Sequence, residues 1–420
     1  MSQAQTDPAA TEPPPRTRPS LGDVLHDIAS GGIVRTVAAI VLSLVVASVL
    51  IVATNADVAR TLPYFFSRPT DFLQAAGQAI GDAYAALFRG SIYNYTATTA
   101  ESAIRPLLES LRFAGPLIAA GLGVALTFRA GLFNIGGQGQ MVIAAIWAAW
   151  ASFQLHLPYG LHLVVAILFG LVGAAIWAGI AGFLKAATGA HEVIVTIMMN
   201  YIAVSLATFL MRTPVLHDMD SGNNPTTRPP DPTAVFPRIF AEFDLRWSFV
   251  LCIVAVGVFW WLMERSSLGF RLRMVGLNPD AARTAGVDVK RMYIVAMVLS
   301  GMFIGVAGLN QALGRDGNFG PTIDAGIGFD AITVALLGGS RAGGVLLAGI
   351  LFGMLRAAGP TMQLADVAPE ILGVIQGLIV LFIAAPPLVR AIFRFLPVPR
   401  EVTELNTGRK PQLEAKEPGQ

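Results

Sequence analysis

Amide, carboxyl and aromatic side chains interrupt otherwise apolar stretches of this sequence. The candidate residues are Phe133, Asn134, Gln138, Gln140, Asn310, Gln311, Phe329 and Asp330. Polar groups are costly inside lipid, so each of them is a candidate functional residue. The chemistry open to them is hydrogen bonding and ring stacking with a polar solute. Alternatively, the amides only join helices, at about 0.6 kcal/mol for each contact.

A histidine and a glutamate, His191 and Glu192, stand directly before another apolar stretch. A carboxylate in the first turn of a helix interacts favourably with the N-terminal end of the helix dipole. The pair could therefore cap that helix or form a gate for a solute. A zinc-protease helix would need a second histidine four residues after His191, where the sequence has Val195.

Other chemistries lack their residues. The sequence contains no Gly-Lys pair, so it has no phosphate-binding loop of the kind that ends in Gly-Lys-Ser/Thr. Five scattered histidines and the single Cys252 do not make the pattern of a metal site. A lipid-modifying enzyme would need catalytic groups clustered at one interface, and the sequence shows none. It therefore predicts no catalytic residue, no metal and no cofactor in this chain.

Long apolar runs must position the polar residues. The chain is 54% hydrophobic and only 13% charged, against about 25% charged in an average soluble domain. About 20 apolar residues in a helix cross the hydrocarbon core, where lipid leaves the backbone no partner but itself. We expect an all-α polytopic membrane protein with about ten segments, some of them short or interrupted. The expected segments are residues 34–54, 106–128, 133–153, 162–184, 192–211, 247–264, 292–313, 326–340, 343–358 and 370–388.

Charge predicts the orientation of these segments. An even number of segments puts both termini on one side, and short loops rich in Lys and Arg favour the cytoplasm for that side. The polar, Pro-rich ends are expected to be disordered, because they bury little apolar surface. The expected parts are cytoplasmic tails 1–32 and 391–420, a membrane domain 33–390, outer loops 55–105 and 212–246, and a cytoplasmic loop 265–291. Residues 70–88 have helical apolar spacing, typical of an amphipathic helix on the outer surface.

Two short glycine-rich patterns repeat along the chain. Gly-Leu-Phe-Asn at 131–134 and Gly-Ile-Gly-Phe-Asp at 326–330 each open an apolar segment, and each is followed by a helix containing Leu-Phe-Gly. By the expected topology the two segments enter from opposite sides. Inverted repeats with short, interrupted helices place a transport path at their interface. Chance similarity between helices rich in Gly and Ala is the alternative.

The cytoplasmic loop contains a short helix pattern. Asn278 suits the N-cap, Pro279 the first helical position and Gly286 the position just past the end. The alanines at positions 281, 282 and 285 predict a flat face that fits a groove on another protein. An ordinary connecting helix is the alternative.

The last two patterns carry a resemblance to a known family. The short helix resembles the coupling helix of ABC importer permeases, with matching residues Gly276, Asn278, Pro279, Ala281, Ala282, Arg283, Ala285 and Gly286. Residues 133–140 resemble the glycine-rich signature of the branch that carries ribose-type sugars, branched-chain amino acids and nucleosides. Together with residues 329–338, the chain looks most like the larger permease of nucleoside importers served by a Bmp-type binding lipoprotein. One departure is Gln138, where many relatives have Glu.

The resemblance implies a function and a set of partners. The chain would be a permease subunit in a bacterial cell membrane, in contact with lipid and not with nucleic acid. ATP would be used by a separate ATP-binding cassette subunit, beside a second, non-identical permease and an extracytoplasmic binding lipoprotein. A nucleoside would stack on the aromatic rings, worth about 1–3 kcal/mol, and bond to the neutral amides. The alternatives are a sugar or branched-chain amino acid permease, and an ion-coupled transporter using Asp330 or Glu192.

Overall fold

The computed structural model describes residues 32–368 and 370–384. The tails expected at 1–32 and 391–420 lie outside these residues, apart from Gly32. The described chain divides into two compact units, with residues 32–42 in the first and residues 43–384 in the second. Within the described residues every regular element is a helix, and only two isolated β-bridges occur, both in the 212–246 loop. The expected all-α class is confirmed.

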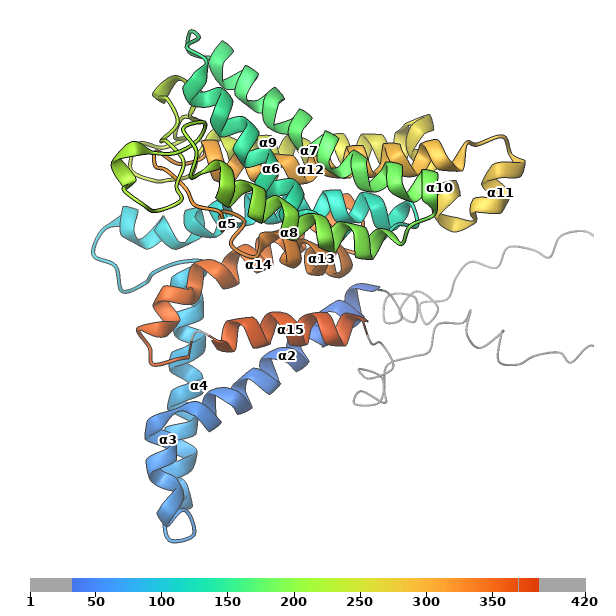
Figure 1. The fold of residues 1–420 in the computed structure, drawn as a ribbon. Helices are drawn as coiled ribbons and strands as arrows, with labels where there is room; N and C mark the ends of the chain where they lie inside the picture. Colours follow the sequence, from blue (N-terminus) through green and yellow to red (C-terminus); the bar gives the residue numbers. More distant parts are fainter. Residues whose placement is uncertain (1–31, 369, 385–420) are drawn as a thin grey trace, which may run out of the picture. The chain divides into compact units, whose positions relative to one another are not determined.

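The helices keep the order of the sequence (Figure 1). They are α2 (Gly32–Thr54), α3 (Ala56–Thr61), η1 (Leu62–Tyr64), α4 (Pro69–Ser91), α5 (Ala100–Arg129), α6 (Gly137–Gln154), α7 (Leu161–Thr188), α8 (Glu192–Leu210), η2 (Met219–Ser221), η3 (Pro232–Ala234), α9 (Trp247–Arg265), α10 (Ser267–Leu277), α11 (Pro279–Thr284), α12 (Val289–Leu313), α13 (Ile327–Leu337), α14 (Ala342–Gln363) and α15 (Glu370–Ala384).

Seven helices of the described chain are long and apolar enough to cross a membrane: α2, α5, α7, α8, α9, α12 and α14. The helices α13 and α15 are apolar but shorter. With 11 residues, α13 rises about 16 Å, roughly half of the hydrocarbon thickness. Its segment, expected at 326–340, ends early because residues 338–341 form a turn before α14. These lengths support a membrane bundle that contains short helices.

Small residues hold the centre of the bundle together. Gly301, Gly305 and Gly308 of α12 face α7 and α6 so closely that a Cβ at Gly301 would lie 2.5 Å from the Ala174 carbonyl oxygen. In lipid, helices associate mainly through such close van der Waals packing. We call this contact the glycine seam. Next to it, Leu117 and its neighbours up to Leu126 make the centre of α5 fully buried.

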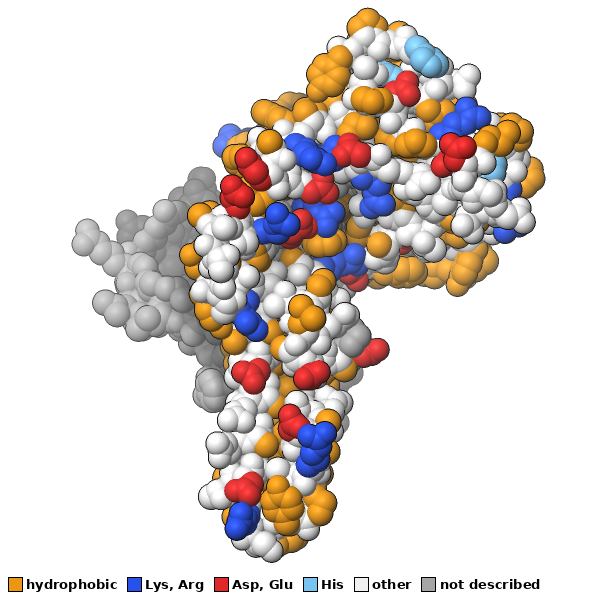
Figure 2. All heavy atoms as spheres, turned by 90° about the vertical axis from the view of Figure 1, so that its left-hand side faces the viewer, with side chains coloured by type: hydrophobic (Ala, Val, Ile, Leu, Met, Phe, Trp, Pro, Cys, Tyr) orange, Lys and Arg blue, Asp and Glu red, His pale blue; other side chains and the backbone are white. Residues whose placement is uncertain are grey.

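The two ends of the second unit carry different features. The short helix α11 lies at one end, and the 212–246 loop lies at the other (Figure 1). Figure 2 faces this loop end, where basic and acidic side chains lie next to one another. The loop is folded rather than extended, because its backbone bonds to the segment after α12, for instance from Thr227 N to Phe319 O at 2.9 Å.

The amphipathic helix predicted for 70–88 is present as α4. Its buried residues, Ala83, Ala86, Gly90 and Ser91, lie in its C-terminal half. That half packs on α14, where a Cβ at Gly90 would lie 2.8 Å from the Thr361 side chain. The first half of α4 is mostly exposed. Its location on a membrane surface stays a prediction.

Candidate functional site

A non-helical loop, residues 132–136, connects α5 to α6 and contains Asn134. The Asn134 side chain is fully buried and donates to Ser300 Oγ at 2.9 Å, and Ser300 in turn donates to the Gly123 carbonyl at 2.7 Å. Asn134 and Gln140 also exchange hydrogen bonds of 3.1 and 3.2 Å. These bonds join the loop to α5, α6 and α12. They satisfy the polar groups of Asn134, as a buried amide requires.

Three residues of α8 hold this loop from the other side. Glu192, Thr196 and Asn200 are spaced four residues apart, so they lie along one face of the helix. Asn200 donates to the Ile135 carbonyl at 2.9 Å and accepts from the Gly139 N–H at 2.8 Å. Thr196 Oγ1 accepts from the Ile135 N–H at 3.3 Å. We call the three residues the α8 clamp.

Glu192 extends the clamp to α7. Its carboxylate accepts the Phe133 N–H and forms an ion pair of 2.8 Å with Lys185 of α7. His191 occupies the N-cap position of α8, but its side chain makes no capping hydrogen bond in the described chain. The geometry therefore gives Glu192 a fastening role for the 132–136 loop.

The N-termini of α6 and α13 meet through two glycines. A Cβ at Gly137 would lie 2.9 Å from the Gly328 carbonyl oxygen, and a Cβ at Gly328 would overlap the backbone of Gln138. Only glycine allows two backbones to approach so closely. The two short helices opened by the repeated sequence patterns are thus in direct contact.

Side chains from three further helices converge on the turn before α13, residues 322–326, which we call the junction turn. Gln138 of α6 donates to the Asp324 carboxylate at 3.3 Å, and Asp324 also accepts the Gly326 N–H at 3.2 Å. Gln311 of α12 donates to the Ile323 carbonyl at 3.4 Å. Arg356 of α14 donates to the Ala325 carbonyl at 3.0 Å.

The junction turn is strained and carries a charge pair. Ala325 has a φ of +46°, a region that non-glycine residues seldom adopt and that surrounding contacts must maintain. Arg356 pairs with Asp330 of α13 at 2.7 Å, and each side chain is less than one quarter exposed. Charges at membrane depth pair with one another because an isolated one is costly. The pair therefore fixes α13 to α14 beside the turn.

A pocket of about 270 Å³ lies on the α11 side of the 132–136 loop. It is lined by Phe128, Gly131, Leu132, Phe133, Glu192 and Leu336. The Phe133 ring is 40% exposed and lies 4.9 Å, centroid to centroid, from the Phe128 ring. The pocket thus offers an aromatic face to a solute.

The structure brings together some of the predicted residues and separates others. Gln138, Gln311 and Asp330 gather around the junction turn. Asn134 and Gln140 are enclosed within the loop, and Phe329 is half exposed on α13. Asn310 lies elsewhere, donating to Ser248 of α9 at 3.0 Å.

The sequence interpretation missed Asp324, Arg356, Thr196 and Ser300 as parts of the site. Arg356 carried a usable signal, because it is a cation inside an apolar segment expected at 343–358. Asp324 lies in a loop, and hydroxyl side chains are common in membrane helices, so the other three residues gave no local signal.

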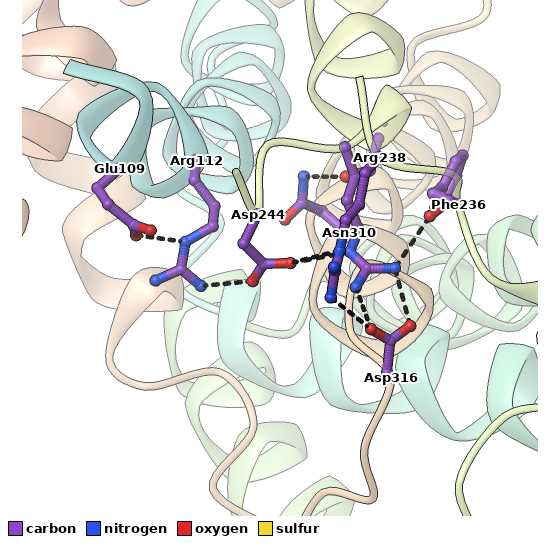
Figure 3. Close-up of polar contacts among 9 residues, drawn as sticks. Glu109, Arg112, Phe236, Arg238, Asp244, Asn310 and Asp316 are labelled. Carbon is purple, nitrogen blue, oxygen red and sulfur yellow. Dashed lines mark hydrogen bonds and ion pairs between the residues drawn. The ribbon is translucent and has the colours of Figure 1, made fainter. Parts of the chain in front are cut away.

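A buried arginine organises the loop end of the bundle (Figure 3). Arg246, only 4% exposed, bonds to both oxygens of Asp316, at 2.6 and 3.1 Å, and to Asp244 at 3.2 Å. It also donates to the Phe236 carbonyl at 3.0 Å. Bidentate arginine–carboxylate pairs are strong and geometrically specific. They tie the segment after α12 to the start of α9.

Further ion pairs extend this charged network. Arg112 of α5 lies 3.8 Å from Asp244, and Arg238 lies 3.0 Å from Asp316. A pocket of about 180 Å³ adjoins it, lined by Arg105, Glu109, Arg238, Glu242, Phe243 and Asp244. The network joins α5, the 212–246 loop and the segment after α12 at the end of the bundle opposite α11.

The Asp316→Asn variant is expected to lose part of the acid sensitivity of folding stability. The hydrogen bond from Arg246 holds the pKa of the Asp316 carboxyl below its ordinary value. A lowered folded-state pKa adds stability above the unfolded pKa of about 3.9, and that stability is lost as the pH falls through the folded value. Thermal unfolding in detergent from about pH 6 to about pH 3 should therefore depend less on pH in the variant. Equal slopes would contradict a stabilising Arg246–Asp316 pair.

The short helix at the other end has the predicted caps. Asn278 accepts from the N–H groups of Asp280 and Ala281, both at 3.0 Å, Pro279 begins α11, and Gly286 has a φ of +82°. The expected flat face of three alanines is wrong in one position. Ala281 and Ala285 are exposed, whereas Ala282 is 1% exposed and points into the protein. In a helix, residues 281 and 285 share a face that 282 does not.

Known proteins share this sequence. Residues 107–384 match the family described as "Branched-chain amino acid transport system / permease component". The guanosine ABC transporter permease protein NupP of Bacillus subtilis is 33% identical over 325 residues, covering 76% of this chain and 89% of the relative. The nucleoside ABC transporter permease protein NupB of Lactococcus lactis is 33% identical over 67% of this chain and 79% of the relative. The glucose ABC transporter permease protein TsgB13 of Haloferax volcanii is 33% identical over 66% and 75%. No solved structure matches the chain.

The family match begins inside α5 and ends with α15. It therefore includes the α8 clamp, the junction turn, the charged network and α11. Long apolar helices and a capped helix at one end agree with it. The chain belongs to the permease-component family of branched-chain amino acid transport systems, and it is a permease subunit of an ABC transporter.

Proposed function

We propose that this permease imports nucleosides, which a binding lipoprotein delivers from outside the cell. The similarity to NupP, along 89% of that relative, is the observation that carries the substrate class. ATP is hydrolysed by a partner subunit, as in ABC transporters generally. Simple sugars are the second candidate, because TsgB13 is equally identical over a shorter part of the chain.

The proposed path runs from the charged network, past the junction turn, to the pocket beside Phe133. Short helices that meet near the middle of a bundle are where transporters of inverted-repeat design bind their substrates. The Gly137–Gly328 contact supports such an arrangement for α6 and α13. With α15, these helices would complete a bundle of ten membrane segments. Gln138, Gln311 and Phe329 would meet the solute, whereas Asn134 and Gln140 would shape the loop.

The proposed orientation places α11 and both termini in the cytoplasm. The alanines exposed on α11 would contact the ATP-binding subunit, and the charged network would face the binding lipoprotein. A second, non-identical permease would complete the channel. Bacillus subtilis supports this pairing, since it has two guanosine ABC transporter permease proteins, NupP and NupQ, both similar to this chain. The 2.7 Å pair between Asp330 and Arg356 weighs against a free ion site at Asp330.

Competition in proteoliposomes tests the substrate class. The complete complex, with its ATP-binding subunit, second permease and binding lipoprotein, should take up labelled guanosine only when ATP is present. Unlabelled adenosine should reduce this uptake, while glucose and leucine should not. Uptake blocked by glucose but not by adenosine would favour a sugar permease. Uptake driven by an ion gradient without the ATP-binding subunit would refute the proposal.

The Arg356→Gln variant is expected to lower guanosine uptake by about tenfold, or about 1.4 kcal/mol. It leaves the Asp330 charge without its partner and weakens the support of the junction turn. The double variant Asp330→Asn/Arg356→Gln removes both charges, so it should recover part of the uptake. Initial uptake rates of the three proteins check this. A double variant as inactive as Arg356→Gln would instead make Arg356 or Asp330 a direct substrate contact.

A further inference from the structure

We propose that movement of α11 reaches the substrate path through one backbone contact, between Gly276 and Gly131. The inference rests on the proposed role of α11 as the contact for the ATP-binding subunit. It makes the two glycines positioning residues: they touch neither ATP nor substrate but set where the 132–136 loop lies.

The contact lies directly before α11. Gly276 belongs to the last turn of α10, two residues before the N-cap Asn278. A Cβ at Gly276 would overlap the carbonyl of Arg129 at the end of α5, and a Cβ at Gly131 would lie 3.0 Å from the Gly276 Cα. No side chain separates the two backbones, so a shift of the α10–α11 segment presses directly on the end of α5.

Ion pairs hold the same helices together around this contact. Glu264, in the last turn of α9, bonds to Arg129 of α5 at 2.5 Å and to Arg273 of α10 at 3.2 Å. The α10–α11 segment therefore cannot slide away from α5 without breaking charged hydrogen bonds. Compression and tension are both transmitted.

From Gly131 the chain enters the clamped loop. Gly131 itself has a φ of +73° and is followed by Leu132 and Phe133, whose N–H is held by Glu192. The next residues are held by Thr196 and Asn200, whose bonds are buried and directional. Packed, hydrogen-bonded elements transmit strain instead of absorbing it.

The far end of the loop is the N-terminus of α6. Asn200 of the clamp also holds Gly139, one residue beyond Gln138, which bonds to Asp324 in the junction turn. A displacement of Gly131 is thus carried to the α6 side of the Gly137–Gly328 contact. The α8 clamp makes the loop and the α6 N-terminus move as one.

Matched glycines allow a sharp test. Gly131→Ala and Gly189→Ala place alanine at nearly the same φ, +73° and +72°, but no other heavy atom of the described chain lies within 4 Å of a Cβ at Gly189. Likewise, Gly276→Ala adds a methyl group into the contact, and Gly257→Ala of α9 adds one to open space. Each pair separates the contact from the cost of the substitution itself.

The readout is guanosine uptake per ATP hydrolysed, measured on the reconstituted complex. We expect the Gly131→Ala and Gly276→Ala complexes to keep hydrolysing ATP while uptake per ATP falls at least tenfold. Both control variants should stay within about twofold of the wild type. If Gly276→Ala does not assemble, Gly131→Ala, whose Cβ needs a smaller displacement, carries the test.

Two results would overturn the inference. One is unchanged uptake per ATP in Gly131→Ala; the other is an equal loss in Gly131→Ala and Gly189→Ala. A wild-type complex that hydrolyses ATP but takes up no guanosine would overturn the proposed substrate instead, and the two failures are therefore distinct.

Discussion

Replacing Ala285 of α11 with arginine is expected to abolish ATP-driven uptake while leaving the chain folded in the membrane. Ala285 and Ala281 are exposed and share one face of α11, so the new side chain points away from the protein's own core. At an interface with the ATP-binding subunit, however, an unpaired charge costs about 2–5 kcal/mol. A cost of about 3 kcal/mol lowers the affinity between subunits by roughly a hundredfold.

Co-purification of the ATP-binding subunit and uptake by the assembled complex measure this effect. Ala285→Ser is the matched control, because serine adds one small hydroxyl group and should leave both quantities within about twofold. Ala282→Arg is no substitute for Ala285→Arg. The Ala282 side chain is buried, so a charge there would damage α11 itself. Full uptake by Ala285→Arg would contradict a partner interface at this face.

Replacing Asn200 with leucine is expected to have the largest effect on stability. The Asn200 amide satisfies the Ile135 carbonyl and the Gly139 N–H, and it is 3% exposed. Leucine has a similar size but bonds to neither group. Each buried polar group left without a partner costs about 1–3 kcal/mol, or about 2–6 kcal/mol for both.

The thermal midpoint in detergent and the yield of monodisperse protein measure this loss. Tyr201→Leu is the control, since Tyr201 is the next residue of α8 and is 69% exposed. An Asn200→Leu variant as stable as the wild type, but unable to transport, would mean that Asn200 contacts the solute. The α8 clamp would then not be needed to hold the loop.

Helices formed by uninterrupted apolar runs could be predicted closely from the sequence. The segment expected at 162–184 is α7, Leu161–Thr188, and the one expected at 192–211 is α8, Glu192–Leu210. The caps of α11 were also readable, because Asn, Pro and Gly act locally. In each case the determining interactions lie within a few residues of the chain.

Boundaries set by distant contacts could not be predicted. The helix α6 begins at Gly137 and not at residue 133, because α8 side chains some 60 positions away hold the intervening backbone. Conversely, α5 begins at Ala100 and not at residue 106. Thr99 caps it through the Ser102 N–H, and hydropathy does not detect its polar first turns.

The candidate site was predictable in type but not in arrangement. Rarity of polar groups in apolar segments identified Gln138, Gln311 and Asp330, which the fold brings to one turn. The same rule selected Asn134, whose bonds to Gln140 and Ser300 depend on how three helices pack. Which amides face a solute is a tertiary property, and one sequence does not encode it locally.

The glycine seam decides where this protein can bend. Backbones in contact along α12, α7 and α6 cannot be squeezed closer, and prising them apart would open a void too narrow for an acyl chain. These helices must swing as one solid block during each cycle. The pivot is then left to the opposite side of α6, where Ala325 and Gly326 already hold left-handed backbone angles. A stiffer residue at either position should jam the machine without loosening any helix.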